Sequence, residues 1–464
     1  MFLDDVERVA RVAKGIIKGK NVKVLAQFDA DGITSAAILT KALMREDAVF
    51  EVKILKQLTS QIIADLKVTD KDVLILADFG SGQLELLKDV LDKTQVIVLD
   101  HHETSEFSHM NLFHVNPLLS GEDEMSASIV CYLFAKYLNL KNVDLVDIAI
   151  IGAAADEADE KWEFKGLIKK VLEEGELIGK ISVVRGLRLY GRNTRPIYKS
   201  LAFTFDPFIP GISGSESQAV QFLSDLSIPV KDGTEWRKLK DLTIDEQQRL
   251  ASAIIVERLK SEEDAADIFG DIHTLFGRPE ELQDVREFGT LINACGRTGN
   301  HDIAVRILLG DYSVMDRCWD VMEKYRGMIA DGLNWVRNNE AKIVKLPGGN
   351  FILARSSIPE VVIGTVCSIV INSGMVDTSK PLFGMAHTED GRMKVSGRVS
   401  KALKEINLKD IISTIVESIG GEGGGHPSAA GAYIPIDRES DFVRLVGGSV
   451  EKDNNGEMFG SKED

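Results

Sequence analysis

Cysteine is scarce in this sequence, and the few cysteines present are scattered. Four occur in 464 residues, and no two have the spacing of a zinc or redox motif. They are Cys131, Cys295, Cys318 and Cys367. This usage does not fit a disulfide-stabilised secreted protein, so we expect reduced cysteines packed in the core of a cytoplasmic protein.

Long hydrophobic runs are also missing. The longest apolar stretches, such as residues 148–155, are far too short to cross a bilayer. The first residues, Met1 to Asp5, lack the basic region and apolar segment of a signal peptide. We therefore expect no membrane association. The net charge of −17 argues against a surface coated with nucleic-acid-binding residues, although it leaves room for a local basic channel.

The chain is organised around Asp100-His101-His102, which follows the apolar run at residues 96–99. Four consecutive apolar residues are typical of a short strand buried in a parallel sheet. A carboxylate and two imidazoles then emerge where the strand ends, which is where open α/β sheets bind their ligands. This tripeptide is therefore the first candidate for a functional site.

Other carboxylates follow apolar segments in the same way. Strand-like residues 22–26 lead into Asp29 and Asp31, and residues 73–77 lead into Asp78, whereas a helical stretch ends at Asp156. Any one of these aspartates alone is better explained as a helix cap. Together with a double histidine they favour an oxygen- and nitrogen-rich site for Mn²⁺ or Mg²⁺.

Strands and helices alternate regularly over residues 1–200, which predicts a doubly wound parallel sheet. Residues 201–340 change to a mainly helical pattern, which ends in a long helix at 316–339 suited to link domains. Strand patterns return over residues 341–440, and a polar tail at 441–464 closes the chain. The prediction is an α/β protein of two sheet domains with a helical region between them.

Residues 184–199 carry five cations and two tyrosines in an acidic chain. Contacts to a phosphate backbone combined with base stacking would use this mixture, and Arg192 and Arg195 are the candidates. A solvated helix face followed by a polar turn explains the composition about equally well.

A glycine-rich segment lies near the end of the chain, with five glycines among residues 420–425 followed by His426 and Pro427. Glycines allow backbone amides to approach an anion closely. A helix beginning near Pro427 would add a dipole that favours phosphate. A tight packing turn is the alternative.

At this point the motifs resemble those of the DHH phosphoesterase superfamily. The four motifs of that superfamily are matched, in order and separation, by Asp29-Ala30-Asp31-Gly32, Asp78, Asp100-His101-His102 and Asp156. Residues 423–431 resemble the signature of its DHH-associated substrate-binding domain. The size, the helical region and residues 206–211 are most similar to the archaeal RecJ-like branch, including its GINS-associated nucleases.

The resemblance implies an exonuclease that binds two Mn²⁺ or Mg²⁺ ions and cleaves single-stranded DNA or RNA, digesting DNA from the 5′ end. It also implies a role in DNA replication or repair together with the GINS complex. It implies metal ligands at Asp29, Asp78, His101 and Asp156, with Asp31 a ligand or near neighbour and His102 orienting the site. Arg398, Gly424, Gly425 and His426 would hold a phosphate. Gln27 departs from the His or Asp of many relatives, which puts the second metal in doubt.

Other functions stay open at this stage. A nanoRNase, a 3′ RNA exonuclease or a cyclic-dinucleotide phosphodiesterase would share both end domains, but would not need the helical region. A pyrophosphatase of the superfamily does not fit the glycine-His-Pro signature. A catalytically silent replication scaffold is the alternative from another class, and loss of the metal carboxylates would identify it, whereas here they are intact.

Overall fold

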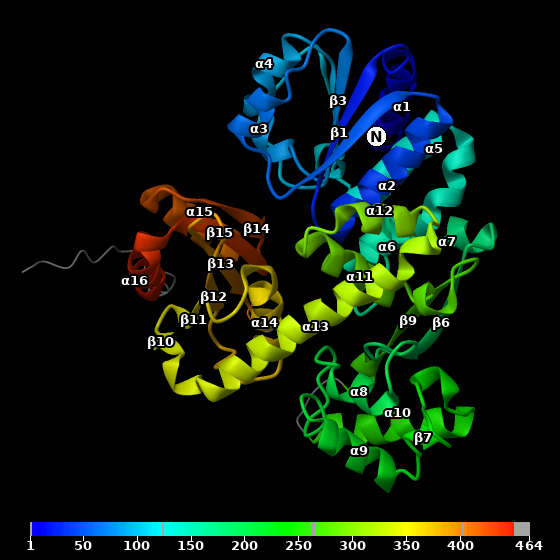
Figure 1. The fold of residues 1–464 in the computed structure, drawn as a ribbon, viewed down its shortest axis with the longest axis vertical. Helices are drawn as coiled ribbons and strands as arrows, with labels where there is room; N and C mark the ends of the chain where they lie inside the picture. Colours follow the sequence, from blue (N-terminus) through cyan, green and yellow to red (C-terminus); the bar gives the residue numbers. More distant parts are fainter. Residues whose placement is uncertain (1, 123–124, 261–264, 401–402, 404, 450–464) are drawn as a thin grey trace, which may run out of the picture. The chain divides into compact units, whose positions relative to one another are not determined.

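The computed structural model describes residues 2–122, 125–260, 265–400, 403 and 405–449. The chain forms two compact units. The first consists of Met1–Leu201 and Glu216–Met322, and the second of Ala202–Ser215 and Glu323–Asp464. Each unit has its own sheet and its own helices (Figure 1).

The first unit is built on a five-stranded parallel sheet with the order β2-β1-β3-β4-β5. Its strands are β1 (Asn21–Gln27), β2 (Val49–Leu55), β3 (Asp72–Ala77), β4 (Val96–Leu99) and β5 (Leu112–Val115). The predicted parallel sheet is confirmed. Every residue of β3 and β4 is buried, as expected for central strands with helices on both faces. The sequence reading missed β5, a short edge strand.

Helices cover both faces of this sheet (Figure 1). One face carries α1 (Phe2–Ile16), α2 (Ala30–Arg45) and α5 (Ala127–Leu138). The other carries α3 (Ser60–Asp65), a 3₁₀ turn at Ser81–Leu87 and α4 (Lys88–Leu91), whose apolar side chains join those of the strands in one core cluster. The first unit is therefore doubly wound, as predicted.

A further layer of helices packs against α2. It consists of α6 (Val146–Ala155), α11 (Val285–Arg297) and α12 (His301–Leu308). Gly296 allows α11 to approach the loop after β1, since a Cβ there would overlap the carbonyl oxygen of Phe28. A buried ion pair between Arg278 and Asp147, with 2.6 Å between Nη2 and Oδ2, fixes the start of α6 to the segment before α11. These contacts join residues far apart in the sequence into one unit.

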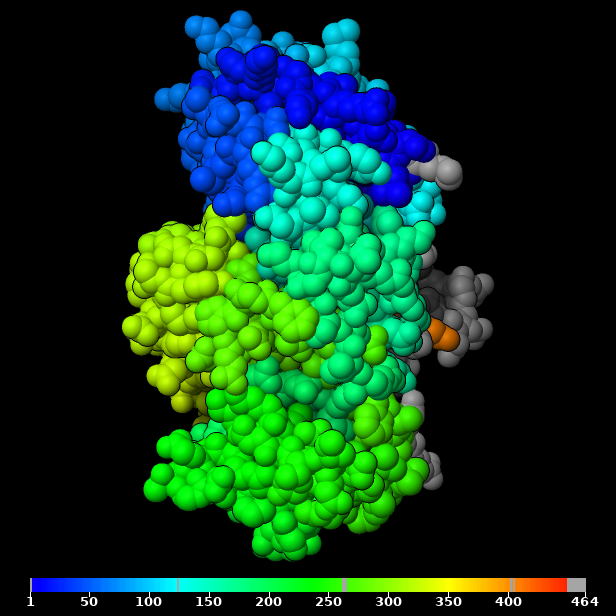
Figure 2. All heavy atoms as spheres, turned by 90° about the vertical axis from the view of Figure 1, so that its right-hand side faces the viewer, coloured from blue at the N-terminus to red at the C-terminus, as the bar shows by residue number. Residues whose placement is uncertain are grey.

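Among its described residues, the rest of the first unit contains two two-stranded antiparallel ribbons and four helices. Its elements are α7 (Gly166–Leu177), β6 (Ile181–Leu187), α8 (Ile197–Ala202), α9 (Glu216–Asp225), β7 (Lys231–Asp232), β8 (Glu235–Trp236), α10 (Ile244–Leu259) and β9 (Phe269–Leu275). The ribbons are β6-β9 and β7-β8. In Figure 2 the green surface of this region continues from a teal surface, the colour that the bar gives to α7. The basic stretch at 184–199 begins in strand β6, continues through turns and ends at the start of α8, which does not fit a helix face followed by a turn, one of the two interpretations left open.

The second unit holds a mixed six-stranded sheet with the order β10-β11-β12-β13-β15-β14. The predicted long helix is confirmed as α13 (Met315–Asn338), which runs from the first unit into the second. The strands are β10 (Val344–Leu346), β11 (Gly349–Arg355), β12 (Leu382–His387), β13 (Arg392–Arg398), β14 (Glu422–His426) and β15 (Ala429–Pro435). α14 (Glu360–Asn372) packs on β12 and β13, while α15 (Leu408–Ile419) and α16 (Glu439–Ser449) share a core with the sheet.

The glycine-rich segment differs from the prediction. Its residues form edge strand β14, and Pro427 lies in the tight turn to β15 instead of beginning a helix. Backbone pairing between the two strands satisfies the amides that a helix would have used, so no helix dipole is available there. Residues 441–449 of the predicted polar tail at 441–464 belong to α16, and residues 450–464 lie outside the described residues.

Two bulk expectations can be compared with this fold. All four cysteines are buried and none forms a disulfide, which confirms the prediction that they are core residues. Among the described residues, no helix combines the length and apolar character that a membrane span requires.

Candidate metal centre

Three adjacent strands deliver the predicted site residues to one edge of the first sheet. β1, β3 and β4 are neighbours and run in the same direction, so their carboxyl ends lie side by side. β3 and β4 end in register at Ala77 and Leu99, which places Asp78 level with Asp100. The Asp78 amide donates to the Leu99 carbonyl at 3.0 Å and its φ is +65°, so the backbone turns sharply there.

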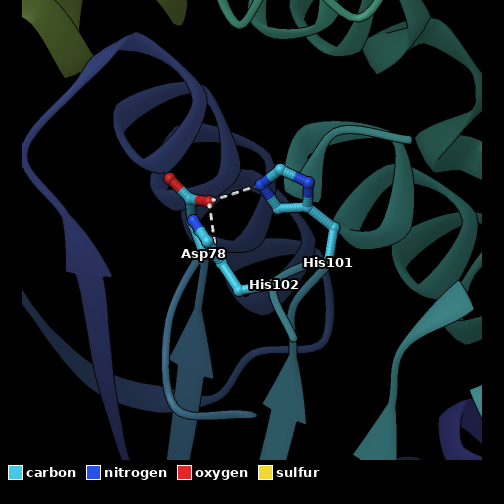
Figure 3. Close-up of side chains that lie close together, drawn as sticks. All are labelled: Asp78, His101 and His102. Carbon is cyan, nitrogen blue, oxygen red and sulfur yellow. Dashed lines mark ion pairs between the residues drawn. The ribbon is translucent and has the colours of Figure 1, made fainter. Parts of the chain in front are cut away.

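His101 lies at the centre of the cluster. Its Nε2 is 3.3 Å from Asp78 Oδ1, and it is 3.9 Å from Oδ2 of both Asp31 and Asp156. Figure 3 shows one oxygen of Asp78 paired with both His101 and His102, with His102 Nδ1 3.9 Å from Asp78 Oδ1. Two groups of potential ligands therefore share His101: Asp78 with His102, and Asp31 with Asp156.

Asp100 does not join these groups, because its carboxylate is used to hold the turn. It is fully buried, and it accepts hydrogen bonds from the amides of Ser81 and His101 and from His102 Nδ1, at 2.8–2.9 Å. Burial acts to raise the pKa of Asp100, but the hydrogen bond and charge of His102 hold this pKa below its usual range. Asp100 is therefore an ionised acceptor that orients His102, with the His102 proton on Nδ1.

Asp31 is held by the start of α5. Its two carboxylate oxygens accept from the amides of Ala127 at 2.6 Å and Ser128 at 2.9 Å, where the helix dipole favours a negative charge. This contact brings Asp31 opposite Asp156, the residue that ends α6. The sequence motif alone did not reveal this partner helix.

Gln27 is the last residue of β1, and Asp29 lies just beyond it at the start of α2. Asp29 caps α2 by accepting from the Gly32 amide at 3.0 Å, and it belongs to neither ligand group. With its amide nitrogen turned toward the carboxylates, Gln27 donates to Asp29 and, at 3.3 Å, to Asp78 Oδ2. The role of Asp29 as a ligand remains a prediction, and Gln27 supplies a neutral amide beside it.

The cluster concentrates negative charge in a buried space. Burial raises the pKa of Asp78 well above its usual range, and the charges of Asp29, Asp31 and Asp156 raise it further. Burial also raises the pKa of Asp31, to about 6, against the hydrogen bonds from Ser128. Buried carboxylates that destabilise one another in this way are what a divalent cation would neutralise. The donor set of carboxylates and imidazoles without thiolates fits Mn²⁺ or Mg²⁺.

The second unit places three of the four predicted phosphate-binding residues, Arg398, Gly424 and His426, on one face of its sheet. In the strand register Arg398 and His426 both lie opposite Ala429, one on each side of it. Residues opposite each other point to the same face, so the two side chains flank Ala429 across two strand spacings, or about 10 Å. Gly424 lies on this face too, with open space where a Cβ would be, whereas Gly425 lies against the Ala429 carbonyl. Arg398 is held by Nε donation to Ser368 at 2.8 Å.

Arg192 and Arg195 lie on the turns that follow β6, and both are half-buried. Arg192 Nε is 4.0 Å from Asp284 Oδ2, and the Arg195 guanidinium lies 4.7 Å from the centre of the Tyr190 ring. They therefore face their own unit and do not form an exposed basic strip. Their role in substrate binding remains a prediction.

Several residues around the site were missed by the sequence reading. Asn116, which follows β5, donates from Nδ2 to the His102 carbonyl at 2.8 Å and to Ser81 Oγ at 3.0 Å. His114 Nε2 is 2.8 Å from the same Ser81 hydroxyl. The sequence signal was weak: Leu112, Phe113 and Val115 suit a short strand that ends before Asn116, but His114 interrupts the apolar pattern. Asn293 of α11, whose Oδ1 accepts from the Ala30 amide at 3.0 Å, had no signal in the sequence.

The fold and the site define a two-unit α/β protein with a carboxylate- and histidine-rich metal centre at the edge of a doubly wound sheet. Family models match three parts of the chain: the N-terminal domain of the DHH family at residues 21–154, the DHH-CID domain at 189–270 and the DHHA1 domain at 350–452. Together these matches cover more than half of the sequence. The chain belongs to the DHH family of phosphoesterases.

Relatives cover nearly the whole chain. An uncharacterized protein of Methanocaldococcus jannaschii is 28% identical over 457 residues, which cover 96% of this chain and 97% of the relative. The crystal structure of exonuclease RecJ bound to manganese has a TM-score of 0.57 at 17% identity, covering 96% of this chain and 94% of that one. CDC45 from Entamoeba histolytica has a TM-score of 0.65 at 10% identity, covering 96% and 98%. The protein therefore has a RecJ-like fold.

Proposed function

We propose that the protein is an exonuclease that hydrolyses phosphodiester bonds in single-stranded nucleic acid, using Mn²⁺ or Mg²⁺. The observation that carries the proposal is the convergence of Asp31, Asp78, His101, His102 and Asp156 at one strand edge. The likeness to manganese-bound RecJ supports the choice of cation and of substrate. The two ligand groups that share His101 suit two ions, with Asp29 and Gln27 beside them.

When bound, such ions neutralise the phosphodiester charge and lower the pKa of an attacking water. The protein side chains supply the remaining parts. Burial acts to lower the pKa of His102, but its hydrogen bond to Asp100 and the charge of Asp100 raise this pKa. Asp100 thereby fixes the His102 ring through Nδ1, so that Nε2 would face an ion or its bound water, and Asp31 would hold the metal side of the site.

The sheet face of the second unit supplies phosphate binding. Arg398 and His426 would hold one phosphate of the strand over the glycine floor of β14 and β15. Arg192 and Arg195 would contact nucleic acid from the turns after β6. We place the direction of digestion on DNA as 5′ to 3′, following the family resemblance.

The test is digestion of 5′- and 3′-labelled DNA and RNA oligonucleotides with Mn²⁺, Mg²⁺ or EDTA. Asp78→Asn should lose more activity than the roughly 10- to 100-fold expected on loss of an outer-shell partner. Asp89→Asn, a matched change on the exposed surface of α4, should cleave like the wild type. Cleavage in EDTA, or equal rates for wild type and Asp78→Asn, would refute the assignment.

We also propose that the protein docks on the GINS complex through the helices of the interposed region. α10 exposes Ile244, Val256 and Leu259, which a partner surface would cover. Ile244→Glu with Leu259→Glu should weaken GINS binding and leave oligonucleotide cleavage unchanged, because both metal and phosphate residues lie outside α10. Leu177→Glu, a matched change at an exposed leucine of α7, should affect neither activity.

The likeness to CDC45 supports a second candidate function, a replisome scaffold with little catalysis. The two proposals differ in the metal-dependent step. A scaffold would bind GINS but leave every oligonucleotide intact with either cation, and Asp78→Asn would then behave as the wild type does.

A further inference from the structure

A cavity of about 190 Å³ lies in the first unit, between the end of α6, the turn after β6 and the face of α11. It is far larger than the roughly 10–15 Å³ that admits one water, and smaller than the roughly 300 Å³ of a typical drug-sized site. The space therefore suits a single ring system and not an extended chain of nucleotides.

Two residues that line the cavity are connected to the metal centre, one through the chain and one through a hydrogen bond. Ala155 lines the cavity and immediately precedes Asp156. Asn293 also lines it and accepts a hydrogen bond from the amide of Ala30, the residue between Asp29 and Asp31. A nucleotide whose phosphate is held at the metal centre would thus have this cavity beside it.

The lining has the two components that recognise a base. Trp162 and Tyr190 provide aromatic surfaces on which a base can stack. Guanidinium groups lie against both rings: those of Arg286 and Arg188 are 4.8 and 5.6 Å from the centre of Trp162, and that of Arg195 is 4.7 Å from the centre of Tyr190. The Asn293 side chain adds an amide, the group that pairs with the edge of a base.

The lining carries more acidic than basic groups, which disfavours a phosphate. Glu157, Asp284 and Glu287 contribute carboxylates, and Arg286 is the cation among the lining residues. Two of these carboxylates are already engaged: Asp284 accepts from the amides of Arg286 and Glu287, and Glu287 accepts from the Asn193 amide at 2.7 Å. The Arg286 charge is already compensated, since Nη2 lies 2.5 Å from Asp159 Oδ1 and Nη1 donates to the Ala154 carbonyl at 3.2 Å. Carboxylates accept hydrogen bonds from amino and hydroxyl groups and repel anions. A neutral base with its sugar fits this lining.

We propose that the cavity receives the base of one nucleotide of the bound strand and so positions the adjacent phosphodiester at the metal centre. This inference rests on the proposed nuclease function and names the substrate group that the site recognises. Trp162, Tyr190 and Asn293 are positioning residues, because they act on the base and not on the reacting phosphate.

A cavity-filling substitution tests the proposal. Thr290 lines the cavity, and its hydroxyl donates to the Arg286 carbonyl within its own helix at 2.8 Å, so Thr290→Leu fills the space at little cost to the fold. The matched control is Thr298→Leu at the end of the same helix, whose hydroxyl makes the same type of bond to Ala294 at 2.7 Å outside the cavity. Circular dichroism confirms that both variants fold.

The first measurement is binding of adenosine and thymidine by equilibrium dialysis in EDTA, which does not depend on catalysis. We expect saturable binding to the wild type and to Thr298→Leu, at least tenfold weaker binding to Thr290→Leu, and no gain from a 5′-phosphate on the nucleoside. Absence of saturable binding, or equal binding by Thr290→Leu, would overturn the proposal.

The second measurement compares an oligonucleotide, the same oligonucleotide with an abasic terminal residue, and bis(p-nitrophenyl) phosphate, which has no base. The wild type should prefer the intact oligonucleotide at least tenfold over the abasic one, and Thr290→Leu should lose this preference while hydrolysing bis(p-nitrophenyl) phosphate at the wild-type rate. A retained preference would overturn the proposal. Failure of the wild type to hydrolyse any substrate would refute the nuclease function, and the dialysis result would then decide the base site alone.

Discussion

Asp31 couples the stability of the first unit to pH when no divalent cation is bound. Burial raises the pKa of this carboxyl from 3.8 to about 6, so the folded chain keeps a proton that the unfolded chain has released. The stability contributed by this group is complete below about pH 4 and is lost as the pH rises through about 6. At about 1.4 kcal/mol per pH unit this amounts to about 3 kcal/mol, or roughly 6 °C in Tm for a unit of this size.

Asp31→Asn removes this titration. The variant also loses one hydrogen bond from the Ala127 or Ser128 amide, which costs about 1 kcal/mol at every pH. We therefore expect the variant to be less stable than the wild type near pH 4 and more stable by about 2 kcal/mol near pH 7. The assay is urea unfolding of both proteins in EDTA across this range, followed by the fluorescence and circular dichroism of the first unit.

Asp72 provides a control of opposite sign at the beginning of β3, away from the metal centre. Burial acts to raise its pKa, but hydrogen bonds from Thr69 hold this pKa below the usual value. Its stabilisation is present above the unfolded pKa and is lost as the pH falls, so Asp72→Asn should become relatively less stable as the pH rises. A stability difference between Asp31→Asn and wild type that does not change with pH would refute the reasoning. Added Mn²⁺ should stabilise the wild type and not Asp31→Asn.

Two further predictions follow from single contacts. Asp100→Asn should lower the cleavage rate about 10- to 100-fold with little loss of fold, because His102 loses its charged acceptor while the ligand groups stay in place. Steady-state kinetics with Mn²⁺ titration checks this prediction. An unchanged rate would contradict it. Gly296→Ala should destabilise the protein by about 1–3 kcal/mol, because the added Cβ would overlap the Phe28 carbonyl. Gly15→Ala, on the open face of α1, should stabilise it by about 0.5–1 kcal/mol. Thermal unfolding measures both changes, and similar Tm shifts for the two variants would contradict the packing argument.

Local patterns in the sequence were sufficient for the doubly wound sheet and for the residues at its edge. The buried runs that form β3 and β4 each end directly before a carboxylate, so Asp78 and the Asp100-His101-His102 turn were predictable from consecutive residues. The long helix α13 and the strands β11, β12 and β13 of the second unit also follow from local periodicity, whereas β10, β14 and β15 were not predicted. The short edge strand β5 was missed because its four residues carry little pattern.

Only the tertiary structure decided which side chains meet. The strand order made β1, β3 and β4 neighbours, and the close packing of α5 and α6 on α2 brought Asp31 and Asp156 to within 3.9 Å of His101. The glycine-rich segment became an edge strand because β15 was available to pair with it, which no local rule could foresee. The cavity beside the metal centre joins residues more than a hundred positions apart, on α6 and α11. Sequence spacing determines which groups emerge from each strand, whereas long-range packing determines the distances between them, and those distances set the chemistry of the site.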